Sequence, residues 1–181
     1  MKETLKEIHI ASLPQTQEEF QTLLLEQVAT PWGSAAMFIV ALNIYVQDPA
    51  LGQACLDMIR LGEPMTQAEL TNVFQVMAGQ YPFVARSYIA GATPRNGYTI
   101  PEGDWIIYIK ITDEKSLRRK SKTVYVGCSG TGSYRPITLA SKPPRFVRKR
   151  FGVKMDYEED PWFVTDYPSI LFHKSHLLYH Y

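Results

Sequence analysis

The hydrophobic period of the sequence changes once, across residues Tyr81–Pro101, a stretch that we call the seam. Before the seam apolar residues recur at helical spacing, and after it they alternate with a period of two. The seam itself contains the turn formers Gly91, Pro94 and Asn96-Gly97. Helices followed by strands predict an α+β fold, with an N-terminal helical layer packed on a C-terminal, mostly antiparallel sheet.

Four helices are predicted before the seam, at about residues 17–28, 31–47, 49–61 and 67–78. Thr30-Pro31 and Asp48-Pro49 each combine an N-cap residue with a proline in the first turn. Thr66-Gln67-Ala68-Glu69 has the pattern of a capping box. The helix beginning at Pro31 is apolar nearly all round, so we expect it at the centre of the core.

Alternating apolar residues predict several strands after the seam. Their expected positions are Trp105–Thr112, Val124–Cys128, Pro136–Ala140, Phe151–Met155, Trp162–Thr165 and Ser169–His173. We expect one domain over residues 1–181, because the chain is long enough for one core and short for two. Within it we expect residues 1–15 to be loosely packed and residues 174–181 to form a tail.

Composition places the chain among globular proteins, since 45% of its residues are hydrophobic and 20% are charged. Cys55 and Cys128 are too few for a disulfide framework. No apolar signal core follows the first residues, and the run Ala35–Val46 is too short for a membrane span. By elimination we expect a cytoplasmic protein with no membrane partner.

Charge is segregated along the chain although the net charge is only +1. Residues 1–109 have five basic and eleven acidic residues, residues 110–154 have thirteen basic and two acidic, and residues 155–181 have a net charge of −4. Basic residues interleaved with aromatic ones are typical of nucleic-acid binding, although they also protect strand edges from pairing. The nucleic-acid candidates in this basic segment are Arg118, Arg119, Lys120, Lys122, Arg145, Arg148, Lys149 and Arg150.

The residues S-Y-I-A-G-A-T-P-R-N-G-Y, Ser87–Tyr98, resemble the motif S-Y-x-A-G-A-T-P-x-N-x-Y of an uncharacterised bacterial family of unknown function. The similarity spans about Thr30–Leu171. Two departures are the residues Thr131–Tyr134, where the family tends to have Ala-Asp-Ser-Pro, and the stretch Lys142–Lys154, which looks like an insertion. The resemblance supports the predicted fold and implies no activity.

Two loops contain candidate ligand-binding residues. In the seam, polar and aromatic side chains either tie down the loop backbone or form a pocket wall. In the loop 127–133, glycines and serines form either an anion-binding nest closed by an arginine or a wide hairpin turn. We expect the two loops to meet at the rim of the sheet. The candidates are Arg86, Ser87, Tyr88, Asn96, Tyr98, Ser129 and Arg135.

No catalytic constellation is complete in the sequence. A hydrolase or transferase site would combine Ser129 and Arg135 with a carboxylate such as Asp57 or Glu63 from the helical half. Cys128, on the inward side of a strand, is more typical of a core residue than of a nucleophile. The tail histidines have helical spacing without an acidic or cysteine partner, so we expect no metal and no cofactor. These histidines are His173, His176 and His180.

We therefore expect a non-catalytic binding or interaction module for an anionic ligand or a macromolecular partner. One alternative is a small hydrolase or transferase with its site near Ser129 and Arg135. Another is nucleic-acid binding through residues 110–154. The sequence leaves open whether the protein forms a homodimer, because short edge strands can pair between two chains.

Overall fold

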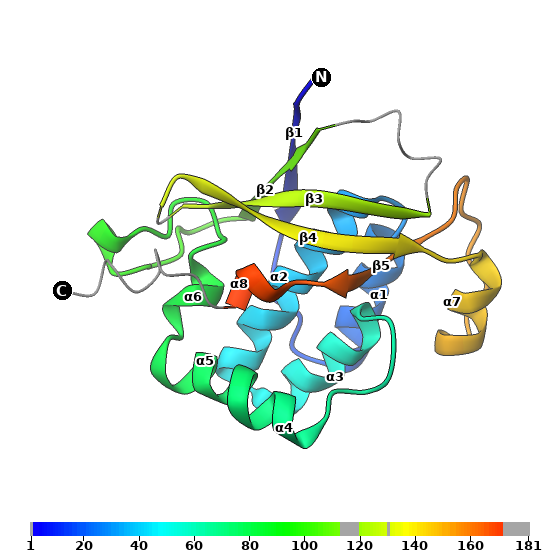
Figure 1. Cartoon of the computed structure of the whole chain (residues 1–181), viewed down its shortest axis with the longest axis horizontal. Coiled ribbons are helices and arrows are strands. Elements are labelled where there is room, and N and C mark those ends of the chain that lie inside the picture. Colours follow the sequence, from blue (N-terminus) through cyan, green and yellow to red (C-terminus); the bar gives the residue numbers. More distant parts are fainter. Residues whose placement is uncertain (1, 113–119, 130, 172–181) are drawn as a thin grey trace.

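Five antiparallel strands form one sheet, in the order in which they occur along the chain (Figure 1). The structure is a computed structural model and describes residues 2–112, 120–129 and 131–171. The strands are β1 (Thr4–Ile10), β2 (Trp105–Ile111), β3 (Ser121–Cys128), β4 (Ser133–Ser141) and β5 (Trp162–Asp166). Most helices precede the strands β2–β5, which confirms the predicted α+β class.

The four helical segments predicted before the seam are all present. They are α1 (Gln17–Gln27), α2 (Pro31–Gln47), α3 (Pro49–Ile59), and a segment in which α4 (Gln67–Glu69), the π-helical turn η1 (Leu70–Phe74) and α5 (Gln75–Gln80) follow one another. Their caps form as the sequence indicates: Thr30 Oγ1 accepts from the Gly33 N–H at 3.0 Å and Thr66 forms the capping box with Glu69. Local signals therefore determine where these helices begin.

Helix α2 forms the centre of the core and contacts all five strands. Its side chains from Ser34 to Tyr45 are buried. Two of its polar side chains bond to distant backbone: Ser34 Oγ donates to the Trp162 carbonyl at 2.7 Å, and Asn43 Nδ2 donates to the Ala85 carbonyl at 3.0 Å. Satisfied buried polar groups of this kind fix how α2 sits against β5 and α6 (Phe83–Arg86).

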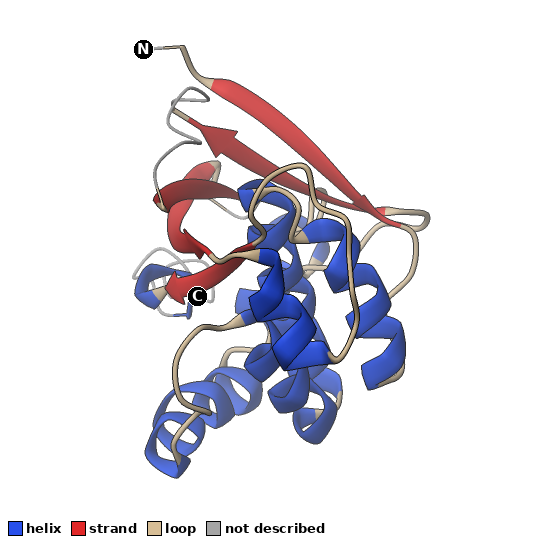
Figure 2. Ribbon diagram, turned by 90° about the vertical axis from the view of Figure 1, so that its right-hand side faces the viewer, coloured by secondary structure: helices blue, strands red, loops and turns tan. Residues whose placement is uncertain are grey.

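The helices cover one face of the sheet and leave much of the other face open (Figure 2). Along β3, Val124 and Val126 point to the helical side and are fully buried, whereas Tyr125 between them points outward. Among the described residues, none of the helices has the length and apolar character needed to cross a membrane.

The expectation of a loosely packed segment at residues 1–15 is wrong for β1. This strand pairs with β2 along its whole length, from Thr4 opposite Ile111 to Ile10 opposite Trp105. The side chains of Ile8 and Ile10, which belong to this strand, are buried. The strand was not predicted because it is an edge strand with the charged pair Lys6-Glu7 at its centre, and these charges interrupt the apolar pattern.

Two predicted strands are not formed by the described residues: only the first residue of one is helical and the rest is irregular, and the other overlaps a short helix. The stretch expected as the strand Phe151–Met155 contains the end of α7 (Pro144–Phe151), which Gly152 terminates with φ 69°. The expected strand Ser169–His173 overlaps α8 (Pro168–Leu171), and His173 lies outside the described residues. The signals that alternating apolar residues outweighed are Gly152, which ends α7, and Pro168 in the first turn of α8.

Candidate functional site

The seam and the loop between β3 and β4 meet at the rim of the sheet, as expected. The Ser129 N–H donates to the Ser87 carbonyl at 2.7 Å, and Ser129 Oγ donates to the Ile89 carbonyl at 2.8 Å. The loop itself joins paired strands, since Cys128 lies opposite Ser133. It is therefore a hairpin connection, and its serine fastens the seam to the sheet.

Asn96 organises the seam through its side-chain amide. Its Nδ2 donates to the Gly91 carbonyl at 2.7 Å, while its Oδ1 accepts from the N–H groups of Thr93 at 3.0 Å and Thr99 at 3.1 Å. One side chain thus replaces three backbone partners in a stretch without regular pairing. For Asn96 this geometry agrees with the first of the two roles considered for the seam side chains, that of tying down the loop backbone.

The other seam candidates are buried and also hold structure. Ser87 Oγ donates to the Val84 carbonyl at 2.6 Å, and the Tyr88 hydroxyl donates to the Ile170 carbonyl at 2.7 Å. Burial raises the pKa of Tyr88 well above its usual value. Tyr98 has φ 58° and packs its ring 5.2 Å from that of Phe83.

None of the pockets described for residues 2–112, 120–129 and 131–171 is lined by both the seam candidates and Arg135. Arg135 lies on the helix-covered side of β4, with 8% of its surface exposed, and its charge acts on the pKa of Tyr88. Arg86 is partly buried at the end of α6. Of the seven candidates only Ser129 lines a depression beside the hairpin, which has a volume of about 220 Å³. Within the described part of the chain, these pockets do not bring the seven candidates together, and the single site stays a prediction.

Among the described residues around Ser129, none supplies a catalytic base. Its hydroxyl proton is directed at a backbone carbonyl, and the described residues that line the depression include no histidine or carboxylate. Asp57 and Glu63, the carboxylates considered for such a site, line a different cavity. Cys128 is buried, as expected for a core residue.

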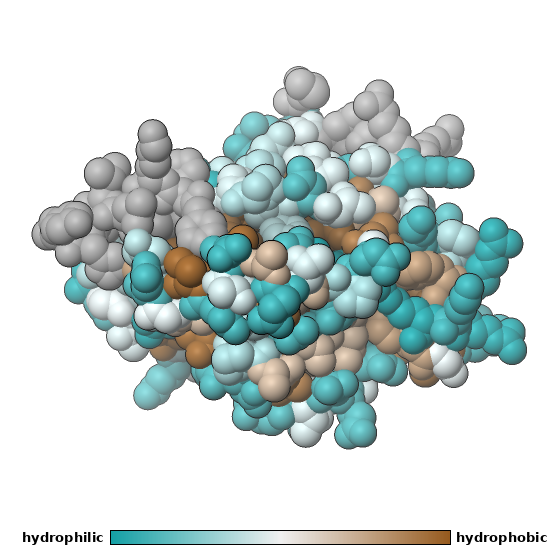
Figure 3. All heavy atoms as spheres, turned by 60° about the horizontal axis from the view of Figure 1, so that its bottom comes forward, coloured by the Kyte–Doolittle hydropathy of each residue, from teal (hydrophilic) through white to brown (hydrophobic). Residues whose placement is uncertain are grey.

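The basic candidates of residues 110–154 do not form one surface. Lys122 points to the helical side of β3 and is 6% exposed, whereas Lys120 is exposed at the start of that strand. Arg145, Arg148 and Lys149 are exposed on α7, where hydrophilic side chains project from the right-hand edge of the molecule (Figure 3). Arg118 and Arg119 lie outside the described residues.

The exposed cations of α7 also have acidic neighbours. Arg145, Arg148 and Lys154 line a groove of about 350 Å³ together with Asp156. Further carboxylates follow at residues 158–160, and all of them are exposed. This mixture lowers the local positive potential that binding to a phosphate backbone requires.

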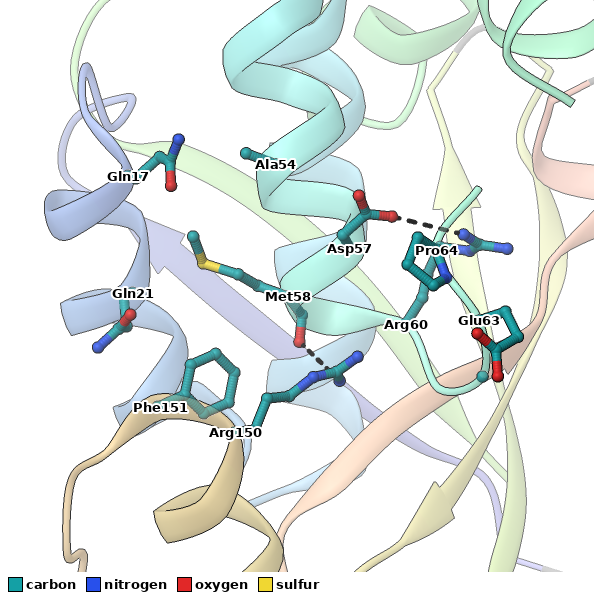
Figure 4. Close-up of a pocket in the computed structure, with 11 residues that line it drawn as sticks. Gln17, Gln21, Ala54, Asp57, Met58, Arg60, Glu63, Pro64, Arg150 and Phe151 are labelled. Carbon is teal, nitrogen blue, oxygen red and sulfur yellow. Dashed lines mark hydrogen bonds and ion pairs between the residues drawn. The ribbon is translucent and has the colours of Figure 1, made fainter. Parts of the chain in front are cut away.

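A cavity with a polar lining lies between α1, α3, the connection after α3, and α7 (Figure 4). Its volume is about 400 Å³. Helix α1 contributes two amide side chains, and α7 contributes a guanidinium group and an aromatic ring (Figure 4). The lining residues are Gln17, Gln21, Ala54, Asp57, Met58, Arg60, Gly62, Glu63, Pro64, Arg150 and Phe151. We call this cavity the α1–α3–α7 cleft.

Arg150 is a partly buried cation in the α1–α3–α7 cleft. Its Nη1 donates to the Met58 carbonyl at 3.2 Å, and its guanidinium lies 5.3 Å from the ring centre of Phe146 and 5.8 Å from that of Phe163. Among the described residues no carboxylate lies within 4.0 Å of it. Burial lowers the pKa of Arg150, and the nearby charge of Arg60 lowers it further, while Asp57 acts in the opposite direction.

Arg60, in contrast, is surrounded by opposite charge. Its guanidinium lies 3.9 Å from Asp57 Oδ1 and 3.7 Å from Glu69 Oε1, and 5.5 Å from the ring centre of Tyr167. Asp57 Oδ1 also accepts from the Met65 N–H at 3.4 Å. These residues form a structural ion network at one wall of the cleft. Arg150 is therefore the cation of the cleft that can form an ion pair with a ligand.

The sequence analysis did not identify this cleft. Arg150 was a candidate for nucleic acid, and Gln17, Gln21 and Arg60 were not candidates for any site. The walls come from segments near residues 20, 57 and 150, and no local motif links them. Among the described residues, no group of three or more histidine, cysteine, aspartate or glutamate side chains is placed to hold a metal ion.

Comparison with protein families found one match, to the family described as "Domain of unknown function (DUF6935)", over residues 12–176. This match agrees with the resemblance seen in the sequence, which also pointed to a family without an assigned activity. Comparisons with curated proteins and with solved structures found no match.

Proposed function

For this chain, which belongs to the family described as Domain of unknown function (DUF6935), we propose that the α1–α3–α7 cleft binds a small anionic ligand. The observation that supports this proposal is Arg150, a partly buried guanidinium that lines the cleft and has no carboxylate within 4.0 Å among the described residues. A buried cation without a carboxylate partner is unfavourable unless hydrogen bonds or an anion compensate it.

The chemistry of the guanidinium specifies the ligand class. Arginine has five N–H donors in a planar fork that matches a carboxylate or a phosphate, and the Met58 carbonyl accepts from only one nitrogen here. The ligand therefore has at least one carboxylate or phosphate group.

The rest of the lining favours a compact polar molecule. Gln17 and Gln21 supply amide donors and acceptors from α1, while Phe151 and Met58 supply an apolar surface (Figure 4). A volume of about 400 Å³ lies within the range of small-molecule sites. The carboxylates of Asp57 and Glu63 also line the cleft, and Asp57 is paired with Arg60. The described lining contains no histidine or cysteine, which favours binding over nucleophilic chemistry by a thiol or an imidazole.

The experiment that tests this proposal is a calorimetric titration of the full chain with separate mono- and dicarboxylates and with phosphorylated compounds, at millimolar concentration. We expect saturable one-to-one binding of at least one of these anions, and no binding of the corresponding amide or alcohol. If every anion fails to bind, or the uncharged analogue binds equally well, the proposal is wrong.

A further inference from the structure

The open face of the sheet has three tyrosines, and two of them, Tyr108 and Tyr134, flank one glycine. Ile107 and Ile109 of β2 and Val126 of β3 are fully buried on the helical side, so Tyr108, Tyr125 and Tyr134 stand on the other side. These three rings are partly exposed. Tyrosine is a residue that often provides a flat, rigid contact surface for a ligand.

Gly127 separates two of these rings. It lies opposite Tyr134 of β4, and a Cβ atom placed on it would lie 3.3 Å from Tyr108 Cβ and 3.5 Å from Tyr134 Cε1. A glycine inside a strand often marks a place where another group approaches the backbone closely. The 220 Å³ depression opens at this point, between the two tyrosines and the seam residues Ala90 and Gly91.

A cation stands beside the depression. Lys110 Nζ lies 4.5 Å from the ring centre of Tyr134, and Lys110 occupies the position of β2 opposite Tyr125. Its carboxylate neighbour is Glu3, at 3.7 Å, whose side chain is 62% exposed. An ion pair with so exposed a partner contributes little free energy, so the ammonium group can also pair with an added anion.

We propose that this depression binds a nucleobase, with the phosphate of the same nucleotide on Lys110. The volume accommodates a single planar ring system, the tyrosines give it aromatic contact, and the adjacent ammonium selects a ring with a phosphate attached. The nucleotide is either free or the exposed residue of a single strand. This site is separate from the α1–α3–α7 cleft and does not depend on the function proposed there.

Cross-strand packing alone gives a competing account of the same geometry. A tyrosine ring over a glycine stabilises a sheet without any ligand. The two accounts differ in what happens when the depression is filled or when a tyrosine outside it is changed. Tyr125 provides this comparison, because it stands on the same face and is partly exposed but does not line the depression.

The test uses the full chain with two probes, a nucleoside monophosphate measured by calorimetry and a labelled homopyrimidine oligonucleotide measured by fluorescence anisotropy. The variants are Gly127→Val, which fills the depression, Tyr134→Leu, which removes the aromatic ring, and Tyr125→Leu as the matched control. Val favours a strand more than Gly does, so the first variant retains the fold. We expect Gly127→Val and Tyr134→Leu each to weaken binding about tenfold, and Tyr125→Leu to leave it unchanged.

Further comparisons separate this site from the cleft and distinguish the two sources of nucleotide. Arg150→Met leaves binding unchanged if the nucleotide is at the tyrosines, whereas loss of binding in that variant would assign it to the cleft and overturn the inference. Binding of the monophosphate indicates a free nucleotide, and binding of the oligonucleotide alone indicates a single strand. If neither probe binds, or Tyr125→Leu weakens binding as much as Tyr134→Leu, the inference is wrong.

Discussion

Arg150 donates from Nη1 to the backbone carbonyl of Met58 at 3.2 Å, and this bond joins α7 to the C-terminal turn of α3 across 92 residues of sequence. The guanidinium therefore occupies a defined position at the wall of the cleft. Helix α7 is also anchored by Phe146, whose ring centre lies 5.1 Å from that of Phe163 in β5. A cation on a rigid element is better placed for ligand binding than one on a free chain end, because less ordering is needed.

Replacing Asn96 with alanine should destabilise the protein by about 2 kcal/mol, because several hydrogen bonds of the seam backbone lose their partner at once. Urea unfolding followed by circular dichroism measures this change. Arg95→Ala is the control, since Arg95 is exposed next to Asn96 and should change stability by less than about 0.5 kcal/mol. Equal stability of both variants would contradict the structural role of Asn96.

Gly52→Ala should destabilise the protein by about 2 kcal/mol or more, because a Cβ atom at Gly52 would overlap the backbone of Tyr45 where α3 crosses α2. Gly79→Ala is the matched control. A Cβ atom there meets nothing within 4 Å, so alanine should stabilise α5 by roughly 0.5–1 kcal/mol. Thermal unfolding should move in opposite directions for the two variants, and a shift in the same direction would contradict the packing described here.

Stability should fall as the pH rises above about 10. Burial raises the pKa of Tyr157 to about 12, and its hydroxyl donates to the Leu25 carbonyl at 2.7 Å. The unfolded tyrosine loses its proton near pH 10. The folded state therefore binds more protons between these values, and this contribution is present below pH 10 and lost towards pH 12.

The measurement for this pH effect is denaturant unfolding at several pH values from 9 to 11, for the wild-type protein and for Tyr157→Phe. The variant should be less stable near neutral pH, because it loses the bond to Leu25, and should show a smaller decrease across the alkaline range. Identical pH profiles for the two proteins would show that Tyr157 does not titrate as expected.

Much of the helical half could be predicted from the sequence because its signals are local. Thr30, Asp48 and Thr66 accept the backbone N–H groups that their cap positions require. Strand signals were weaker where charge was present, so β1 was missed, and the basic stretch that forms α7 was not predicted to be a helix. In both segments the apolar residues are few, and tertiary packing decides the outcome.

The sites could be predicted only in part. Asn96 and Ser129 were identified from turn chemistry. Asn96 holds the seam in shape, and Ser129 joins the hairpin loop to the seam. Arg135 was expected beside Ser129, but alternation along β4 turns it to the opposite face of the sheet. The walls of the α1–α3–α7 cleft come from three segments that are distant in the sequence. A single sequence contains no local pattern that predicts that these segments line one cavity.

The central claim is that Arg150 binds an anion in the α1–α3–α7 cleft, and it is tested most directly by titrating Arg150→Met and Arg148→Met with the anion that binds the wild-type protein most tightly. Arg148 lies on the same helix, is exposed and does not line the cleft, so its replacement removes the same charge elsewhere. We predict that Arg150→Met weakens binding at least about tenfold and that Arg148→Met stays within about twofold of wild type. Unchanged affinity in Arg150→Met, or an equal loss in both variants, would contradict the claim.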